Sequence, residues 1–348
     1  MWATKSISRI SRQWIHLQQT ELNRPLFLKI QQFGSDADSC CILRADRVLS
    51  TYSVSQVRDT WQRMDVSTER EAGNMPYGKE FMDPWARRQH EMEAKMKHLN
   101  LSFAACGFLG IYHLGAASAL CKHGKKLLKV VKAFAGASSG SLIATVLLTV
   151  PENIEECTKM TYTFAEETRK LYFGALTPGF DVMTKLRGLI DSVLPPNAHE
   201  IAENRLFVSV TSAKNGKNHL LSNFASREDL VKALLASSFI PLYAGINAME
   251  YKGEKWIDGG LTSGLPILPL GRTVTVSPFC GRLDICPQYK GHIDIYVKVA
   301  KQDIMLSITN LVRLHQALFP PSQEKMKSLY QDGFDDAVHF LLKENWFE

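Results

Sequence analysis

The chain has 348 residues, of which 45% are hydrophobic and 22% are charged, and its formal net charge at pH 7 is +6. This composition is that of an ordinary globular protein, long enough for one large α/β domain with additions or for two domains. The excess of basic residues is small and forms no tract with interleaved aromatic residues, which argues against a nucleic-acid-binding protein. It is compatible with weak attraction to an anionic membrane surface.

The seven cysteines are odd in number and irregularly spaced. We interpret them as reduced thiols of an intracellular protein, and no Cys/His spacing predicts a zinc site. The stretch Leu99–Cys121 contains no Lys, Arg, Asp or Glu and is long enough to cross a membrane. Three glycines interrupt it, and its apolar pattern changes from strand-like to helix-like, so we expect no transmembrane segment.

Residues 1–20 are basic and contain no acidic residue, and their apolar residues fall on one helical stripe. This pattern is typical of a mitochondrial transit peptide, with a disordered basic extension or an artefact of start-site choice as the alternatives. Residues 21–95 show no domain-like pattern. We therefore predict that residues 1–95 form an extension that catalysis does not need, and that Met96 would be a natural start for a shorter, complete protein.

The rest of the chain alternates between apolar runs typical of strands and segments with helical spacing. Such alternation predicts an α/β fold with a largely parallel sheet, comprising a catalytic core over residues 96–275 and a C-terminal strand and helices over 276–348 packed on it. Strands are expected at 99–105, 130–134, 206–211, 219–222, 250–251, 255–257, 273–276 and 293–297, and helices at 111–123, 142–148, 151–171, 181–194, 227–237, 303–318 and 323–343.

The turn between the second strand and its helix has the pattern Gly-x-Ser-x-Gly, with Ser138 between Gly136 and Gly140. In a nucleophile elbow the turn is so tight that only glycine fits on either side of the serine. We expect Ser138 to have a strained backbone and a hydroxyl exposed at the carboxyl end of the strand, where the next helix directs its positive dipole. The alternative is a Ser/Gly-rich loop without chemistry.

Two further turns contain candidates for the other catalytic functions. The backbone amides of Gly107, Phe108 and Leu109 precede a helix and are little obstructed, so they are candidates for an oxyanion hole. On this interpretation Gly107→Val would severely reduce turnover and leave the fold largely intact. Asp258 ends a strand and precedes two glycines, so its carboxylate is a candidate base for Ser138. A plain tight turn and an ordinary Asp-Gly turn are the respective alternatives.

Together, and in this order, the three motifs resemble those of the patatin-like phospholipases. They are Ala105-Cys106-Gly107-Phe108-Leu109-Gly110, Gly136-Ala137-Ser138-Ser139-Gly140 and Asp258-Gly259-Gly260. The wording CGFLGIYHLG, with Leu265-Pro266 after the third motif, is similar to the vertebrate adiponutrin branch of that family. The resemblance extends from about Met96 to Glu348 and does not include the first 95 residues.

The resemblance implies a three-layer α/β/α sandwich with a Ser–Asp dyad and with no catalytic histidine, metal or cofactor. Ser138 would be the nucleophile and Asp258 its base, and the amides of Gly107, Phe108 and Leu109 would form the oxyanion hole. The remaining motif glycines are Gly110, Gly136, Gly140, Gly259 and Gly260. Two departures could lower activity: Ala105 stands where the family commonly has Gly, and Ser263 where an Asn usually fixes the aspartate loop.

The family implies hydrolysis of carboxyl esters of lipids, namely acylglycerols, phospholipids and retinyl esters, with transacylation when an alcohol replaces water. It also implies peripheral contact with membranes or lipid droplets and an intracellular location, either in the cytoplasm or at such a surface. If residues 1–20 are a transit peptide, the location would be mitochondrial.

Three interpretations stay open at this point. A conventional triad could use His292 with Ser138 and Asp258. Alternatively, the chain could be a catalytically weak lipid-binding or lipid-droplet scaffold of the same fold. A set of apolar residues after position 170 could line an acyl site, but we interpret each as core: Phe173, Leu176, Phe180, Leu242 and Tyr243.

Overall fold

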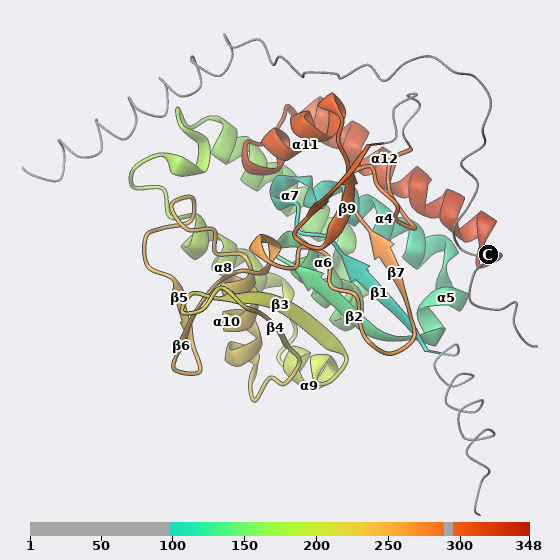
Figure 1. Ribbon diagram of the computed structural model, residues 1–348, viewed down its shortest axis with the longest axis horizontal. Coiled ribbons are helices and arrows are strands. Elements are labelled where there is room, and N and C mark those ends of the chain that lie inside the picture. The colour runs from blue at the N-terminus through green and yellow to red at the C-terminus, as the bar shows by residue number, and fades with distance from the viewer. Residues whose placement is uncertain (1–97, 289–294) are drawn as a thin grey trace, which may run out of the picture. The chain divides into compact units, whose positions relative to one another are not determined.

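A computed structural model of the protein describes residues 98–288 and 295–348 (Figure 1). The predicted extension over residues 1–95, including its transit-peptide interpretation, and His292 of the alternative triad therefore lie outside the described residues.

A seven-stranded sheet forms the centre of the fold, with the strand order β5-β6-β3-β2-β1-β7 and with β4 paired to β3. β3, β2, β1 and β7 are parallel to one another, whereas β4 and β6 pair with β3 in the antiparallel direction and β5 pairs with β6 in the same way. The predicted α/β fold with a largely parallel central sheet is therefore confirmed. The strands are β1 Leu99–Phe103, β2 Val131–Ala137, β3 Leu206–Ser212, β4 Asn218–Leu221, β5 Met249–Tyr251, β6 Glu254–Asp258 and β7 Arg272–Val276.

Most helices lie on predicted segments, but α5 and α9 were not predicted. Several begin where a polar side chain accepts a hydrogen bond from the first turn: Asp181 caps α8, Ser226 caps α10 and Ser322 caps α12. The helices are α4 Gly110–His123, α5 Lys125–Val130, α6 Ser139–Thr149, α7 Ile154–Arg169, α8 Val182–Val193, α9 Ala198–Ala202, α10 Arg227–Ser237, α11 Ile308–Leu318 and α12 Gln323–Lys343, and the short 3-10 turns are η1 Gly107–Leu109, η2 Pro151–Asn153, η3 Gly174–Leu176 and η4 Gly259–Leu261.

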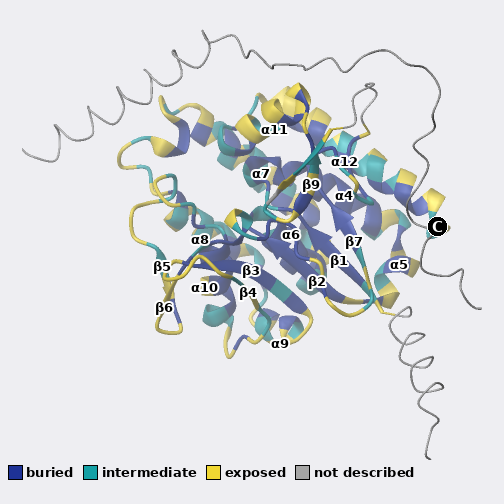
Figure 2. Ribbon diagram, viewed as in Figure 1, coloured by how far each residue is buried: buried dark blue, intermediate teal, exposed yellow. Residues whose placement is uncertain are grey.

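The two faces of the central strands are covered differently. Alternate residues such as Phe103, Phe134 and Val208 belong to the main core beneath the helices, and the strands that carry them are buried (Figure 2). On the opposite face the small residues Ala133 and Ala135 pack against Leu268, from the segment between η4 and β7.

α12 packs against α4 through a glycine on each helix. A Cβ atom at Gly115 of α4 would lie 1.9 Å from the carbonyl oxygen of Tyr330, and one at Gly333 of α12 would lie 2.1 Å from that of Tyr112. The Tyr112 hydroxyl also donates a 2.6 Å hydrogen bond to Asp336. Close backbone approach and a buried polar bond therefore attach the C-terminal helix to the helix that follows β1.

The predicted helix over 303–318 begins too early. Residues Gln302–Met305 form β9, which pairs with β8, Tyr296–Val299, in a separate two-stranded sheet. α11 begins only after Ser307, whose side chain accepts a hydrogen bond from the Asn310 amide.

The stretch Leu99–Cys121, long enough to cross a membrane, forms β1, η1 and most of α4. Within residues 98–288 and 295–348, no helix combines the length and apolar character that a membrane span requires.

Candidate active site

Ser138 occupies the predicted elbow between β2 and α6. Its backbone has φ 53° and ψ −132°, a left-handed conformation that costs free energy in a non-glycine residue. A Cβ at Gly136 would lie 2.5 Å from backbone atoms of Gly140, and one at Gly140 would lie 2.3 Å from the carbonyl oxygen of Phe103. The predicted strained turn and its need for both glycines are therefore confirmed.

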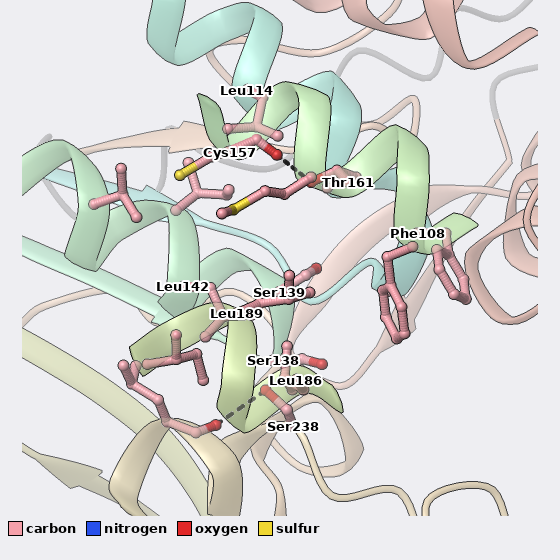
Figure 3. A pocket seen from close by; sticks show the side chains of 18 of the residues that line it. Phe108, Leu114, Ser138, Ser139, Leu142, Cys157, Thr161, Leu186, Leu189 and Ser238 are labelled. Carbon is pink, nitrogen blue, oxygen red and sulfur yellow. Dashed lines mark hydrogen bonds between the residues drawn. The ribbon is translucent and has the colours of Figure 1, made fainter. Parts of the chain in front are cut away.

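The serine is more enclosed than we expected. Ser138 is only 6% exposed, because it lies at the wall of a cavity rather than on the outer surface. Figure 3 shows Ser138 and Ser139 beside the apolar side chains of Leu142 and Leu186. The expectation of an openly exposed hydroxyl was wrong, since helices packed above the carboxyl ends of the strands cover it.

The sheet register brings Asp258 to the same end of the sheet as Ser138. Ala137, the residue before Ser138, pairs with Ser209 of β3, and the next residue of β3, Val210, pairs with Asp258 of β6. β2 and β6 therefore pair one after the other along the same edge of β3, the edge opposite β4, and this brings the two candidate side chains close together. Asp258 is 2% exposed and is not among the residues that line the cavity.

The Asp258 carboxyl has a pKa of about 6, raised from its ordinary value because burial removes water from the charged form. A hydrogen-bonding contact with the Ser138 side chain and a 2.6 Å bond from the Gly260 amide oppose this rise. Among the described residues no hydrogen bond of standard geometry joins Ser138 Oγ to the Asp258 carboxylate. The contact with the serine is therefore weaker than the bond from the Gly260 amide. A carboxylate with this pKa is ionised at neutral pH and can still accept a proton.

Several bonds hold the loop that carries Asp258. The Thr211 hydroxyl donates to the Asp258 carbonyl at 2.8 Å, and the Asn218 amide lies 3.1 Å from the Thr262 hydroxyl. The Ser263 carbonyl accepts a 2.9 Å bond from the Ser209 hydroxyl. Side chains of β3 and β4 thus fix this loop from outside it, a contribution that the sequence analysis missed.

The close packing of this loop also accounts for its two glycines. A Cβ at Gly259 would lie 2.0 Å from the Ser209 carbonyl oxygen, and one at Gly260 would lie 2.7 Å from the Ala105 Cβ.

The amides proposed for the oxyanion hole differ in their availability. Those of Gly107 and Phe108 have no acceptor among the described residues, whereas the Leu109 amide donates a 3.0 Å bond to the Cys106 carbonyl. Leu109 is therefore not a free donor in this geometry. The Ser139 amide, in the first turn of α6, also has no acceptor within the described residues, and sequence analysis had not singled it out.

Gly107 has a structural requirement of its own. Its φ is +52°, and a Cβ there would lie 2.1 Å from the carbonyl oxygen of Ala317 in α11. The expectation that Gly107→Val leaves the fold intact is therefore wrong, because the new side chain would displace α11.

The Cys106 thiol, although close to the site, is not a competing nucleophile. It lies 3.2 Å from Ser139 Oγ, and burial raises its pKa to about 12. The thiol therefore stays protonated at neutral pH.

His113, which is buried near the site, is also a poor base. His113 Nε2 lies 2.9 Å from the Ala104 carbonyl oxygen, and burial lowers the pKa of the imidazole to about 4. Within residues 98–288 and 295–348 no cluster of three His, Cys, Asp or Glu side chains could hold a metal ion.

Ser237, at the end of α10, supports the elbow directly. Its Oγ accepts a 2.9 Å bond from the Ser138 amide and donates a 2.7 Å bond to the Ser209 carbonyl. Two residues later, the Phe239 carbonyl accepts a 2.8 Å bond from the Asp258 amide. The turn after α10 therefore contacts the backbone of both candidate catalytic residues, and 99 residues separate Ser237 from Ser138 in the chain.

We expect Ser237→Ala to lower kcat by about 10- to 100-fold with little change in KM, because the strained elbow loses the hydroxyl that orients it. The variant also leaves a buried amide unpaired, which we expect to cost about 1–3 kcal/mol of stability. Steady-state kinetics on a soluble ester and chemical unfolding measure the two effects.

The matched control for Ser237→Ala is Ser102→Ala, which removes a buried hydroxyl that has no partner among the described residues. Ser237→Thr keeps the hydroxyl and should restore much of the rate. A parallel rise in KM, or equal losses in Ser102→Ala, would contradict a positioning role.

Ser138 and Phe108 border an apolar cavity of about 200 Å³ (Figure 3). Of the five apolar residues that we interpreted as core, Tyr243 lines this cavity, and Phe173, Leu176 and Leu242 are exposed. The core interpretation was wrong for these four. The cavity walls come from α6, α7, α8, the turn after α10 and α11, and include Leu142, Val146, Met160, Phe164, Leu186, Leu189, Ile190, Tyr243 and Leu318.

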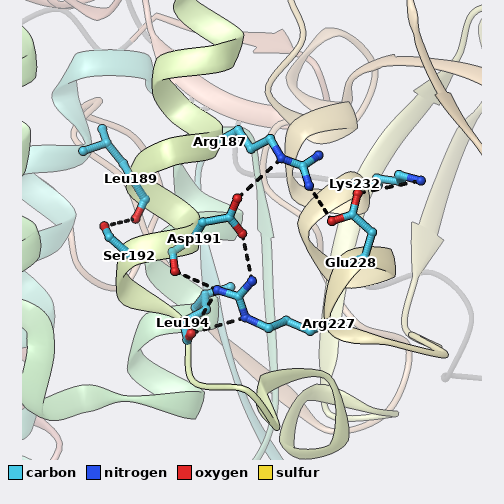
Figure 4. A network of polar contacts seen from close by, with 8 residues as sticks. All are labelled: Arg187, Leu189, Asp191, Ser192, Leu194, Arg227, Glu228 and Lys232. Atoms are coloured by element: carbon cyan, nitrogen blue, oxygen red, sulfur yellow. Dashed lines mark hydrogen bonds and ion pairs between the residues drawn. The ribbon is translucent and has the colours of Figure 1, made fainter.

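An ion-pair network attaches the α8 wall of this cavity to α10 (Figure 4). Arg187 pairs with Asp191 on the same helix and with Glu228 on α10. Arg227 of α10 pairs with Asp191 at 2.8 Å and donates to the carbonyls of Asp191 and Leu194 at the end of α8. Because these charges are partly exposed, the network serves mainly to fix the position of α8.

Comparisons with known proteins identify the family of the chain. The family model described as patatin-like phospholipase matches residues 101–270, which span β1 to the segment before β7. A human protein named patatin-like phospholipase domain-containing protein 4 is 72% identical over 253 residues, covering 73% of this chain and 100% of that protein.

More distant relatives match the same part of the chain. The mouse patatin-like phospholipase domain-containing protein 2 is 38% identical over 250 residues, covering 70% of this chain and 50% of that protein. The mouse 1-acylglycerol-3-phosphate O-acyltransferase Pnpla3 is 35% identical over 243 residues, covering 70% of this chain and 58% of that protein.

Among solved structures, VipD from Legionella pneumophila is similar with a TM-score of 0.41 and 15% identity, over 72% of this chain and 67% of that one. The high identity along the whole human relative and the family model over the strands that carry the elbow lead to one conclusion: the chain belongs to the patatin-like phospholipase family.

Proposed function

We propose that the protein is a serine lipid acyl hydrolase that uses Ser138 and Asp258 on carboxyl esters. The observation that carries this proposal is a buried carboxylate with a pKa of about 6 in contact with an elbow serine beside an apolar cavity. Membership of a family whose named relatives include phospholipases and an acyltransferase supports lipid hydrolase activity.

In the proposed mechanism, Ser138 Oγ attacks the ester carbonyl carbon while Asp258 takes the hydroxyl proton. The amides of Gly107, Phe108 and Ser139 stabilise the oxyanion, together with the amino-terminal dipole of α6. When the tetrahedral intermediate collapses, Asp258 returns the proton to the departing alcohol and the acyl group stays on Ser138. Water activated by Asp258 then releases the fatty acid, or a second alcohol accepts the acyl group.

The apolar cavity supports a long acyl chain as the group transferred to Ser138, because its lining offers few polar partners for a polar substrate. Acylglycerols, phospholipids and retinyl esters all present such a chain, and the family resemblance proposes these three classes. Action on them entails peripheral contact with a membrane or lipid droplet, at an intracellular site that residues 1–20 could shift to mitochondria.

We expect purified protein to react with a fluorophosphonate probe, because only an activated serine forms the phosphonyl ester. Peptide mapping should locate the label on Ser138, and Ser138→Ala should abolish it. Heat-denatured wild type is the control for nonspecific labelling.

A protein that folds normally but fails to label would contradict the hydrolase and favour the alternative, a lipid-binding or lipid-droplet scaffold of the same fold.

A further inference from the structure

α11 buries a polar side chain and exposes apolar ones, the reverse of an ordinary surface helix. Its polar Asn310 is buried, accepts a 3.0 Å bond from the Cys280 amide and donates to the carbonyls of Cys280 and Met305. Its apolar residues Ile308 and Leu311 lie on the outer side and are 81% and 59% exposed. Within residues 98–288 and 295–348, no segment covers the apolar side of α11 that carries Ile308 and Leu311.

Two neighbouring loops expose large apolar residues in the same way. Tyr172 and Ile246 are 90% and 87% exposed, and Leu242 is 80% exposed at a left-handed backbone position. A single exposed apolar residue is ordinary, whereas several large ones on neighbouring segments form the kind of patch that marks an interaction surface. The exposed regions of Figure 2 include these loops and the outer side of α11.

The two loops meet the C-terminal end of α11 beside the cavity that Ser138 borders. The Tyr243 hydroxyl donates a 2.7 Å bond to the Leu318 carbonyl, which joins the loop after α10 to the end of α11. A Cβ at Gly174 would lie 3.4 Å from the Phe319 ring, so the loop after α7 reaches the same point. Tyr243 and Leu318 themselves line the cavity.

From this continuity we propose that a rim formed by Tyr172, Phe173, Leu242, Ile246, Ile308 and Leu311 inserts into the surface of a phospholipid layer. This inference rests on the proposed function and deepens it, because an ester with a long acyl chain is concentrated in such layers and not in water. Docking by the rim would place the cavity entrance against the lipid, so that a chain could move from one apolar environment to another.

The charges beside the rim indicate that apolar insertion, rather than attraction to anionic headgroups, supplies the affinity. Arg169 and Lys170 both pair with Glu166, and Lys185 pairs with Glu167 at 2.7 Å. Glu166 and Glu167 offset two of these three positive charges, so the cluster has a net charge of only +1 and adds little attraction to lipid phosphates. Binding by the rim should therefore resist high salt.

The experiment uses the full chain carrying Ser138→Ala, so that vesicles stay intact, and measures flotation with phosphatidylcholine vesicles at 0.1 M and 1 M KCl. We expect binding at both salt concentrations and at least tenfold weaker binding after Ile246→Glu with Ile308→Glu. Leu342→Glu is the matched control, because Leu342 is 55% exposed on α12 and is not part of the rim. It should bind like the parent.

A second measurement separates docking from chemistry. With Ser138 present, the rim variant should hydrolyse a water-soluble short-chain ester at the parent rate and lose most hydrolysis of vesicle-borne esters. If the parent hydrolyses neither ester but still floats with vesicles in a rim-dependent way, the proposed hydrolase activity is rejected and the proposed docking surface is supported.

Three results would overturn the docking surface. The first is unchanged flotation of the rim variant, and the second is binding that disappears at 1 M KCl. The third is failure of the parent to bind vesicles. Light scattering would then show whether the rim is covered within a dimer that the variant dissociates. If the parent is monomeric, another part of the chain covers the rim.

Discussion

Ser138→Ala and Asp258→Asn should each lower esterase kcat by about 10³-fold or more, and the double variant should be little worse than either single one. Residues that act as one unit give strongly non-additive losses, because a serine without its base and a base without its serine are nearly equally inactive. Steady-state kinetics of the four proteins on one soluble ester give this double-mutant cycle directly.

Asp336→Asn is the matched control for the aspartate substitution. Asp336 is also a shielded carboxylate whose pKa burial raises to about 6, but its partner is Tyr112, and it is not among the residues that line the cavity. The same chemical change should leave kcat unchanged there. Losses that multiply in the Ser138/Asp258 double variant would show that the two residues do not share a mechanism.

The parts of the site predicted from sequence are those fixed by short stretches of chain. The elbow is one, since Gly136 and Gly140 have no room for a side chain and the strained φ of Ser138 follows from the turn they define. α10 covers Arg227–Ser237 as predicted, because Ser226 gives it an explicit start.

What sequence reasoning missed depends on contacts between distant segments. Nothing in the local sequence around Ser237 indicates that its hydroxyl meets an amide 99 residues away, and Asn218 reaches Thr262 only because β4 folds back on β3. The exposed side of α11 escaped prediction for a related reason. Its apolar spacing predicts a helix but cannot tell which face is buried, and Asn310 is held inside by bonds to the distant Cys280.

Removing the Asp258 charge should also stabilise the fold. The folded-state pKa of about 6 lies above the ordinary value of 3.8, so the folded protein holds this proton more tightly than the unfolded chain. The stability associated with the proton is present below about pH 4 and is lost as pH rises through about 6. At pH 8 the buried charge is therefore a cost, and Asp258→Asn should raise the free energy of unfolding by about 1–3 kcal/mol.

The same titration of Asp258 should also control catalysis, but activity should rise with pH where stability falls. Only the ionised carboxylate can take the proton of Ser138, so kcat/KM should rise about tenfold per pH unit below about pH 6 and level off above it. Urea unfolding of Asp258→Asn and wild type between pH 4 and 8 should give curves that coincide at pH 4 and separate with a midpoint near that of the activity profile. If the variant is no more stable than wild type at pH 8, the carboxylate bears no desolvation penalty. If the two midpoints differ, a group other than Asp258 controls the rate.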